Sequence, residues 1–232
     1  MPQASLNPEE IFIRRIQNSL LQQSIAGWRR RGKTLIEINC GDGRFSRTLW
    51  QAGFDVTATE ADFNLRTLAA SSLAGRTEIY AANELDLPFD HNEFDWAVLH
   101  LESTKSSELK EVFQEASRVA AHGVVVTFWN ACSPVFLLAG RKLWGKSYSW
   151  FSVQAALRAL KVGSLTTRTT LLFAWPILRR IWPRLFFSSV KTRLPLGAWA
   201  TLRLDLSPRS TVTPLMLPTK LRKLNRFEPV LE

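Results

Sequence analysis

Cysteine, histidine and long apolar runs are scarce in this chain of 232 residues. Its two cysteines, Cys40 and Cys132, are too few for a disulfide framework and form no CxxC pair, as is typical of a reducing compartment. Three histidines without clustered spacing predict no metal site. The N-terminus lacks the apolar segment of a signal peptide, and the apolar run 171–178 is shorter than the roughly 20 residues that span a membrane. We therefore expect a cytoplasmic protein.

Acidic residues are also scarce in the second part of the chain. Residues 1–139 carry 13 Lys or Arg and 17 Asp or Glu, whereas residues 140–232 carry 17 and 3. Such asymmetry indicates an anionic partner, although a solvated basic face produces the same count. Because several tryptophans accompany these bases, region 140–226 predicts peripheral contact with an anionic membrane, and nucleic acid is the less favoured partner.

Strand-like and helix-like segments alternate as far as residue 130, and 46% of all residues are hydrophobic. Alternation of this kind is typical of a parallel sheet with right-handed crossovers. We predict an α/β fold with a Rossmann-like, doubly wound, mostly parallel seven-stranded sheet and a helical cap inserted after the fifth strand. The expected strands are 34–38, 54–59, 76–81, 94–100, 123–129, 165–173 and 198–206. The expected helices are 8–26, 44–52, 64–73, 106–120, 133–144 and 152–161.

The same pattern predicts a single domain over residues 1–206, followed by an irregular tail. The least regular segments of such folds set substrate choice. The tail, residues 207–232, contains four prolines and a cluster of bases. The parts of the domain are a cofactor half at 33–130, a cap or substrate region at 1–32 and 131–190, and a last strand at 198–206.

A glycine-rich turn flanked by two acids follows the first expected strand. Gly41 and Gly43 allow the backbone to turn sharply and to approach a ligand closely, as in nucleotide-binding sheets. Glu37 and Asp42 place carboxylates around this turn, which would repel a pyrophosphate and attract an ammonium or sulfonium group. The charge therefore favours S-adenosylmethionine over NAD as the cofactor. Ser46 stands where a dinucleotide fingerprint has its third glycine, so the glycines alone leave a nicotinamide-dependent oxidoreductase open.

Polar residues stand at or just after four consecutive expected strand ends, namely Glu37, Glu60, Asn83 and His100. Open α/β sheets bind ligands at the carboxyl ends of their strands, so we expect these residues to line one site. Glu60 lies 17 residues after Gly43, close to where an acid accepts hydrogen bonds from both ribose hydroxyls. Asn83 could accept from an adenine amino group while the N–H of Glu84 donates to the ring, although ordinary loop polarity explains both residues equally well.

Four segments within residues 33–130 fit the pattern of one family. They read Glu-Ile-Asn-Cys-Gly-Asp-Gly at 37–43, Val-Thr-Ala-Thr-Glu at 56–60, Leu-Pro-Phe-Asp-His-Asn-Glu-Phe-Asp at 87–95, and Glu-Ala-Ser-Arg-Val at 115–119, followed by Gly123. In these segments the chain resembles class I S-adenosylmethionine-dependent methyltransferases of the group called type 11. The single domain 1–206 is then expected to be a methyltransferase domain.

The resemblance implies a role for each matching position. Glu37 would anchor the amino group of the cofactor, directly or through water. Gly41 and Gly43 would admit its methionine part, and Glu60 would hold the ribose. Asn39 and Glu60 replace the first glycine and the commoner aspartate of the family pattern. The complete implied cofactor site is Glu37, Asn39, Gly41, Gly43, Glu60, Ala61, Asn83 and Glu84, the last two beside the adenine, and His100 facing the transferred methyl.

Methyl transfer from a sulfonium is an in-line displacement that the cofactor itself activates, so no catalytic triad is required. His100 and Glu102 are the nearest candidates for a general base, although a lone histidine at a strand end is often structural. The tryptophans and bases of residues 130–190 favour transfer to a small, lipophilic acceptor. A nucleic-acid methyltransferase and, because of Asn39, a non-catalytic S-adenosylmethionine-binding protein are the alternatives.

Overall fold

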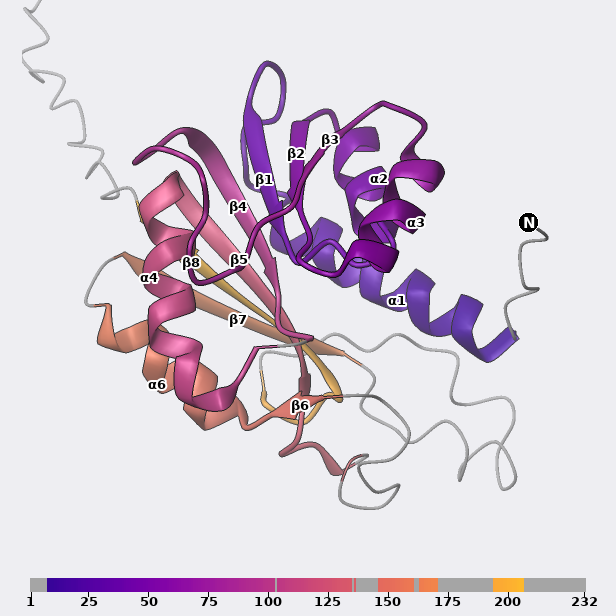
Figure 1. Cartoon of the computed structure of the whole chain (residues 1–232). Coiled ribbons are helices and arrows are strands. Elements are labelled where there is room, and N and C mark those ends of the chain that lie inside the picture. The colour runs from indigo at the N-terminus through magenta and orange to yellow at the C-terminus, as the bar shows by residue number, and fades with distance from the viewer. Residues whose placement is uncertain are drawn as a thin grey trace, which may run out of the picture.

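The computed structural model describes residues 8–102, 104–134, 136, 146–160, 163–170 and 194–206. These residues form one mixed sheet with helices on both faces (Figure 1). Most of the expected helix 133–144 and the whole expected tail 207–232 lie outside the described residues. Within the described part of the chain, no helix has both the length and the apolar character needed to cross a membrane.

The sheet follows the strand order β3-β2-β1-β4-β5-β8-β7, and β6 pairs with β5 outside this path. Strands β1 to β5 run parallel to their neighbours, whereas β8 runs antiparallel to both β5 and β7. The predicted doubly wound, mostly parallel fold is confirmed, with eight strands in place of seven. The additional strand is β6, which is too short to produce a sequence pattern. The bounds are β1 Thr34–Ile38, β2 Asp55–Thr59, β3 Glu78–Tyr80, β4 Phe94–His100, β5 Ala120–Asn130, β6 Ser147–Tyr148, β7 Ser164–Thr170 and β8 Trp199–Asp205.

The direction of winding reverses at β1. Strands β2 and β3 are added on one side of β1, while β4 and β5 are added on the other. Ile38 at the end of β1 is in register with Thr59 of β2 and Leu99 of β4, so three strand ends meet there. Such a switch point is where open α/β sheets bind their ligands. The residues that follow these three strands therefore gather at one edge of the sheet.

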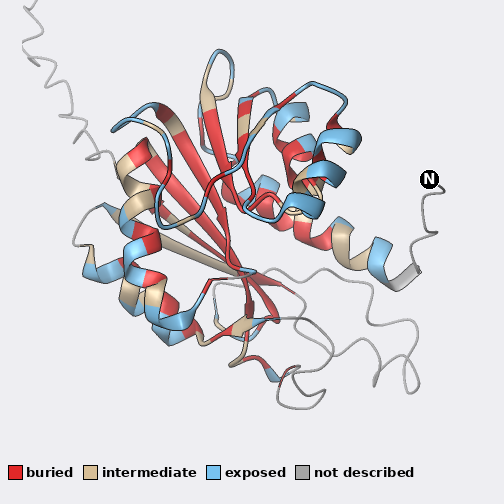
Figure 2. Cartoon of the chain, in the orientation of Figure 1, coloured by how far each residue is buried: buried red, intermediate tan, exposed pale blue. Residues whose placement is uncertain are grey.

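Side chains of the central strands alternate between two cores, one on each face of the sheet. The central strands are buried along most of their length (Figure 2). Leu35 and Val125 pack on the face covered by α1 and α2, whereas Ile36 and Val124 pack on the face covered by α4 and α6. Burial on both faces explains why these strands read as continuous apolar runs. The helices are α1 Pro8–Ser24, α2 Arg44–Gln51, α3 Phe63–Leu73, the short 3₁₀ turn η1 Ser106–Glu108, α4 Leu109–Val119 and α6 Trp150–Ala159.

Helix α6, which belongs to the expected cap, extends a helical layer on one face of the sheet. It lies beside α4 (Figure 1) and begins two residues before the predicted start. Its Trp150, Val153 and Leu157 are buried in the same core as Phe113 of α4. The spacing of these three residues gives α6 one apolar stripe, which packs toward the sheet and α4. The tryptophans expected in the cap at positions 144, 175 and 182 lie outside the described residues.

Candidate functional site

The backbone between β1 and α2 turns through three left-handed residues. Asn39, Gly41 and Gly43 have φ angles of 59°, 58° and 75°, a region that glycine enters freely and that asparagine tolerates better than most residues. Two hydrogen bonds of 3.0 Å close the turn, from Cys40 N to the Thr59 carbonyl and from Gly43 N to the Cys40 carbonyl. The sharp turn predicted from the sequence is therefore confirmed.

The two glycines of this turn have different surroundings. A Cβ atom on Gly43 would lie 3.1 Å from Leu73 Cδ1 and 3.2 Å from Ala69 Cβ, so this glycine lets α2 and α3 approach each other. A Cβ atom on Gly41 would meet no heavy atom within 4 Å. Gly41 therefore presents bare backbone to an open cradle, which is the property that a ligand-binding turn requires.

Glu60 joins the turn to the segment that follows β2. Its carboxylate accepts a hydrogen bond of 2.9 Å from Gly41 N and one of 3.0 Å from Asp62 N, and the residue is 7% exposed. Ala61 lies exposed between these two acids, and its carbonyl accepts from Arg66 Nη1 at 3.2 Å. An ionised carboxylate offers about four acceptor positions, so Glu60 keeps capacity for further donors beside Gly41.

Glu37 and His100 meet inside the sheet, where they are 0% and 1% exposed. Glu37 Oε1 lies 2.9 Å from His100 Nε2, and the other carboxylate oxygen accepts from the Ser46 hydroxyl. His100 Nδ1 lies 2.6 Å from Thr127 Oγ1, and its ring stacks on Phe45 with centroids 4.6 Å apart. We call Glu37, Ser46, His100 and Thr127 the inner network.

The inner network corrects two expectations drawn from the sequence. Glu37 has no exposed surface and both its oxygens are engaged, so direct contact with a cofactor amino group does not fit this arrangement. His100 has both ring nitrogens engaged, so it is not an accessible general base and does not face a transferred methyl group. The structural interpretation of the histidine is the one that the geometry supports. Thr127 gave no sequence signal, and Ser46 was noted only for its place in the glycine pattern, because a single buried hydroxyl has no characteristic spacing.

Asn39 links the turn to the ends of two other strands. Its side-chain amide donates to the Glu84 carboxylate and, over 3.2 Å, to the His100 carbonyl. The residue is almost fully buried, so the side chain that replaces a glycine has found room. Asn39 therefore connects the segments after β1, β3 and β4, a function that glycine could not perform.

Asn83 and Glu84 lie in the segment after β3 but differ from expectation in how they face the site. The Asn83 side chain is exposed and accepts from Leu85 N at 3.0 Å, so it folds back onto its own loop. Glu84 is half-buried and contributes its carboxylate, which Asn39 contacts, whereas the sequence pointed to its backbone N–H. We call Asn39, Gly41, Glu60 and Glu84 the outer rim.

Two further titratable groups near the turn are the Cys40 thiol, which is poorly suited to nucleophilic chemistry, and the Glu102 carboxylate. Burial raises the pKa of the Cys40 thiol, and the nearby Glu37 and Glu60 carboxylates raise it further, so the thiol stays protonated at neutral pH. Glu102, the second candidate base, is partly exposed and accepts from Arg44 Nη2 at 2.9 Å. This ion pair orients the Glu102 carboxylate toward Arg44 and leaves it further acceptor positions.

A network on the opposite face explains two of the family-like segments. Glu115 of α4 accepts from Arg118 Nε at 2.8 Å and from Leu87 N at 2.9 Å. Arg118 also donates to the carbonyls of Leu87, at 3.0 Å, and Phe89, at 2.7 Å. The Leu-Pro-Phe segment and the Glu-Ala-Ser-Arg segment are therefore two halves of one contact, which anchors the chain just beyond Glu84.

Comparison with known proteins agrees with this architecture. Residues 36–128 match a family model described as a methyltransferase domain. Within these residues, the chain is similar to methyltransferase domains. Two of the similar solved structures contain bound S-adenosylhomocysteine or S-adenosylmethionine. No curated protein matches the chain.

Solved structures share the fold of this chain over most of its length. A possible histamine N-methyltransferase from Thermotoga maritima superposes with a TM-score of 0.63 at 16% identity, covering 86% of this chain and 94% of the other. Magnesium protoporphyrin IX methyltransferase from Synechocystis PCC 6803, solved with bound S-adenosylhomocysteine, gives 0.63 at 12% identity, covering 89% and 90%. Geranyl diphosphate C-methyltransferase from Streptomyces coelicolor A3(2) gives 0.58 at 15%, covering 82% and 75%. At these identities the likeness establishes the fold.

Proposed function

We propose that this chain binds S-adenosylmethionine against the outer rim and transfers its methyl group to a small, lipophilic acceptor. The observation that carries the proposal is the turn at the switch point. There, Gly41 faces open space while its N–H is held by the carboxylate of Glu60. The turn is thus rigid, bare of side chains on one side and acidic.

The charges of the rim fit this cofactor better than a dinucleotide. Asp42, Glu60 and Glu84 surround the turn. Among the ion pairs of the described residues, only Asp42 of these three has a cationic partner, because Arg14 Nη1 lies 3.1 Å from its Oδ2. Carboxylates attract the ammonium and sulfonium groups and accept from ribose hydroxyls, whereas they repel a pyrophosphate. Glu60 is the residue we assign to the ribose, because it already stands beside the open face of Gly41.

The bound cofactor would supply an activated methyl group, whose carbon accepts the lone pair of the acceptor as the sulfur–carbon bond breaks and its electron pair returns to sulfur. The protein then has to align the two reactants and keep water away. In this proposal the inner network performs the alignment. Glu37, His100 and Thr127 connect β1, β4 and β5 at the edge where the rim stands, so they act as positioning residues and not as acid–base groups.

A cluster of buried aromatic rings beside the inner network makes the surroundings of this edge of the sheet apolar. Trp129 and Trp199 are paired across β5 and β8, and their rings lie 4.8 Å apart. Phe136 packs against Trp129, with centroids 6.2 Å apart, and Phe45 lies 6.4 Å from Trp199. Two of the structural neighbours are described as methylating magnesium protoporphyrin IX and geranyl diphosphate, which both carry large apolar groups. These observations support a lipophilic acceptor for this chain.

Calorimetric titration of the full chain with S-adenosylhomocysteine, S-adenosylmethionine and NAD tests the cofactor assignment. We expect Glu60→Ala to weaken S-adenosylhomocysteine binding by about 1–3 kcal/mol, the loss of charge-assisted hydrogen bonds. Glu111→Ala is the matched control, because it removes the same charge from an exposed position on the far face. Binding of NAD without S-adenosylhomocysteine would contradict the proposal, and unchanged affinity in Glu60→Ala would remove Glu60 from the site.

Asn39 supports a second candidate, a domain that binds the cofactor without turnover. Its side chain fills the place of a glycine and bonds to Glu84, which narrows the movement available to the rim. Asn39→Gly separates the two candidates, measured as methyl release from S-adenosylmethionine with a panel of lipophilic acceptors. If the unmodified chain transfers methyl groups, it is an enzyme, whether or not Asn39→Gly lowers the activity. If only Asn39→Gly transfers methyl groups, the unmodified chain is a binding protein.

A further inference from the structure

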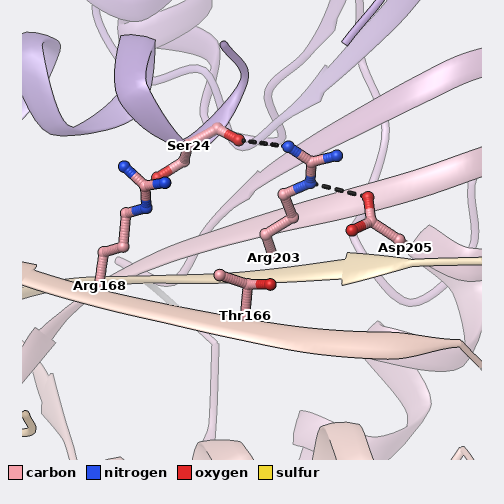
Figure 3. Close-up of a pocket in the computed structure, with 5 residues that line it drawn as sticks. All are labelled: Ser24, Thr166, Arg168, Arg203 and Asp205. Carbon is pink, nitrogen blue, oxygen red and sulfur yellow. Dashed lines mark hydrogen bonds and ion pairs between the residues drawn. The ribbon is translucent and has the colours of Figure 1, made fainter. Parts of the chain in front are cut away.

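A second hollow lies at the other end of the sheet, separated from the glycine turn by β4 and β5. It has a volume of about 220 Å³ and is lined by Ser24, Thr166, Arg168, Arg203 and Asp205 (Figure 3). Ser24 is the last residue of α1, and the other four belong to the antiparallel pair β7 and β8. The proposed methyl transfer uses none of these residues.

Strand alternation explains why polar side chains converge here. Thr166 is in register with Arg203, and Arg168 is in register with Thr201, so these side chains share one face of the β7–β8 pair. The opposite face of β8 carries Leu202 and Leu204, which are buried in the core under α4 and α6. The end of α1 covers the polar face, where Ser24 Oγ lies 2.8 Å from Thr201 Oγ1.

Arg203 is held firmly and its charge is already balanced. Its Nε donates to Asp205 over 2.7 Å, and its Nη1 donates to the Ser24 carbonyl over 3.1 Å. The guanidinium also lies over the Trp28 ring, 5.5 Å from the centroid. These contacts fix one wall of the hollow and leave the remaining N–H groups of Arg203 free to donate.

Arg168 stands across the hollow from Arg203, and no ion pair with a described residue balances its charge. It is half-buried and has no hydrogen bond or ion pair with any residue of the described part of the chain. Figure 3 shows its guanidinium beside Ser24, with Thr166 between the two arginines. Two guanidinium groups therefore share a recess with one carboxylate, and like charges in a partly desolvated recess repel each other unless an anion lies between them.

We propose that this hollow binds a phosphate group, either free or as the end of a phosphate monoester. The planar N–H fork of arginine matches the oxygens of phosphate, and Thr166 places a hydroxyl at the floor between the two forks. A volume of 220 Å³ is several times the roughly 30 Å³ that one water occupies in the liquid, so a phosphate group and its attached carbon fit. The site is independent of the cofactor site at the glycine turn.

Calorimetric titration of the full chain with inorganic phosphate at low ionic strength tests the site. We expect saturable binding that Arg168→Gln weakens by about tenfold, as loss of a bidentate charged contact requires. Arg158→Gln is the matched control, because it removes the same charge from an exposed position on α6; it should change binding by less than about twofold. Equal weakening in both variants would mean attraction to the overall positive charge and would overturn the proposal.

Two further measurements complete the test. If Arg168→Gln fails to fold by circular dichroism, Thr166→Val takes its place, and unchanged phosphate binding in that variant would overturn the proposal. Sedimentation with phosphatidylcholine vesicles, with and without phosphatidic acid, identifies the source of the phosphate group. If the protein binds the vesicles, and if inorganic phosphate displaces it and Arg168→Gln abolishes binding, the ligand is a lipid headgroup. If the protein binds phosphate but not the vesicles, the ligand is soluble. If it binds neither, the proposed site is overturned.

Discussion

The inner network and the outer rim use the same kind of side chain in opposite ways. Glu37 lies at the centre of the sheet, and side chains from α2 and β4 engage both its oxygens. Glu60 follows the neighbouring strand, β2, and lies at the outer rim, where among the described residues its oxygens accept from backbone N–H groups beside an open turn. A carboxylate enclosed by side chains stabilises the fold, whereas one that faces a bare backbone is available to a ligand. Both acids stand at the end of an expected strand, so the sequence alone does not show which of them is enclosed.

The variant Glu37→Ala should show the largest difference in stability between the two acids. Removal of one partner from a buried polar pair, together with the cavity that it leaves, should lower the free energy of unfolding by about 3–5 kcal/mol. Urea denaturation followed by circular dichroism measures the loss, and Glu60→Ala should lose far less stability. A Glu37→Ala protein of normal stability that no longer binds S-adenosylhomocysteine would reverse the assignments of the two acids.

A smaller loss of stability is expected from Glu115→Gln, which tests whether the Glu115–Arg118 contact holds the loop next to the outer rim in place. The change weakens the contact with Arg118 and should cost about 1–2 kcal/mol of unfolding free energy. Glu108→Gln provides the comparison, because its partner Lys105 is mostly exposed and the pair should contribute little. Equal losses in the two variants would show that the Glu115–Arg118 contact does not anchor the loop at Leu87 and Phe89.

The same contact predicts an acid-sensitive contribution to stability. The hydrogen bond from Arg118 lowers the pKa of the Glu115 carboxyl, while the unfolded chain keeps the ordinary value of about 4.3. The unfolded state therefore binds more protons between these two values, so the contribution is present above about pH 4.3 and is lost as pH falls through the folded pKa. Unfolding free energies measured from neutral to acidic pH should fall less steeply in Glu115→Gln, and parallel curves would contradict the assignment.

The smallest effect should come from Arg14→Gln, which removes the cationic partner of Asp42. Both side chains are partly exposed at 3.1 Å, and exposed ion pairs contribute about 0.2–1 kcal/mol. Thermal unfolding should change little, and S-adenosylhomocysteine should bind no more weakly because the released Asp42 adds negative charge to the rim. Loss of affinity in Arg14→Gln would show that α1 shapes the rim directly.

Local pattern was sufficient to predict most of the fold and the sharp turn at its switch point. The alternation of segments predicted the parallel sheet, and the pair Gly41 and Gly43 predicted the turn that the φ angles confirm. The local pattern did not predict where α6 packs, because a helix in a cap and a helix in a layer on the sheet have the same kind of apolar stripe. It also missed β6, because two residues carry no periodicity.

By itself, the sequence determined that the chain folds as a doubly wound sheet with an acidic, glycine-rich turn at its switch point, because period and turn chemistry are local properties. Only the tertiary structure decided which polar residues face a ligand. His100 and Asn39 each stand at a strand end, yet one closes an internal network through Glu37 and Thr127 while the other joins three loops. Exposure depends on which residues from distant segments fill the neighbouring space. For the same reason, the recess between Arg168 and Arg203 exists only because β7 and β8 pair in one register beneath the end of α1.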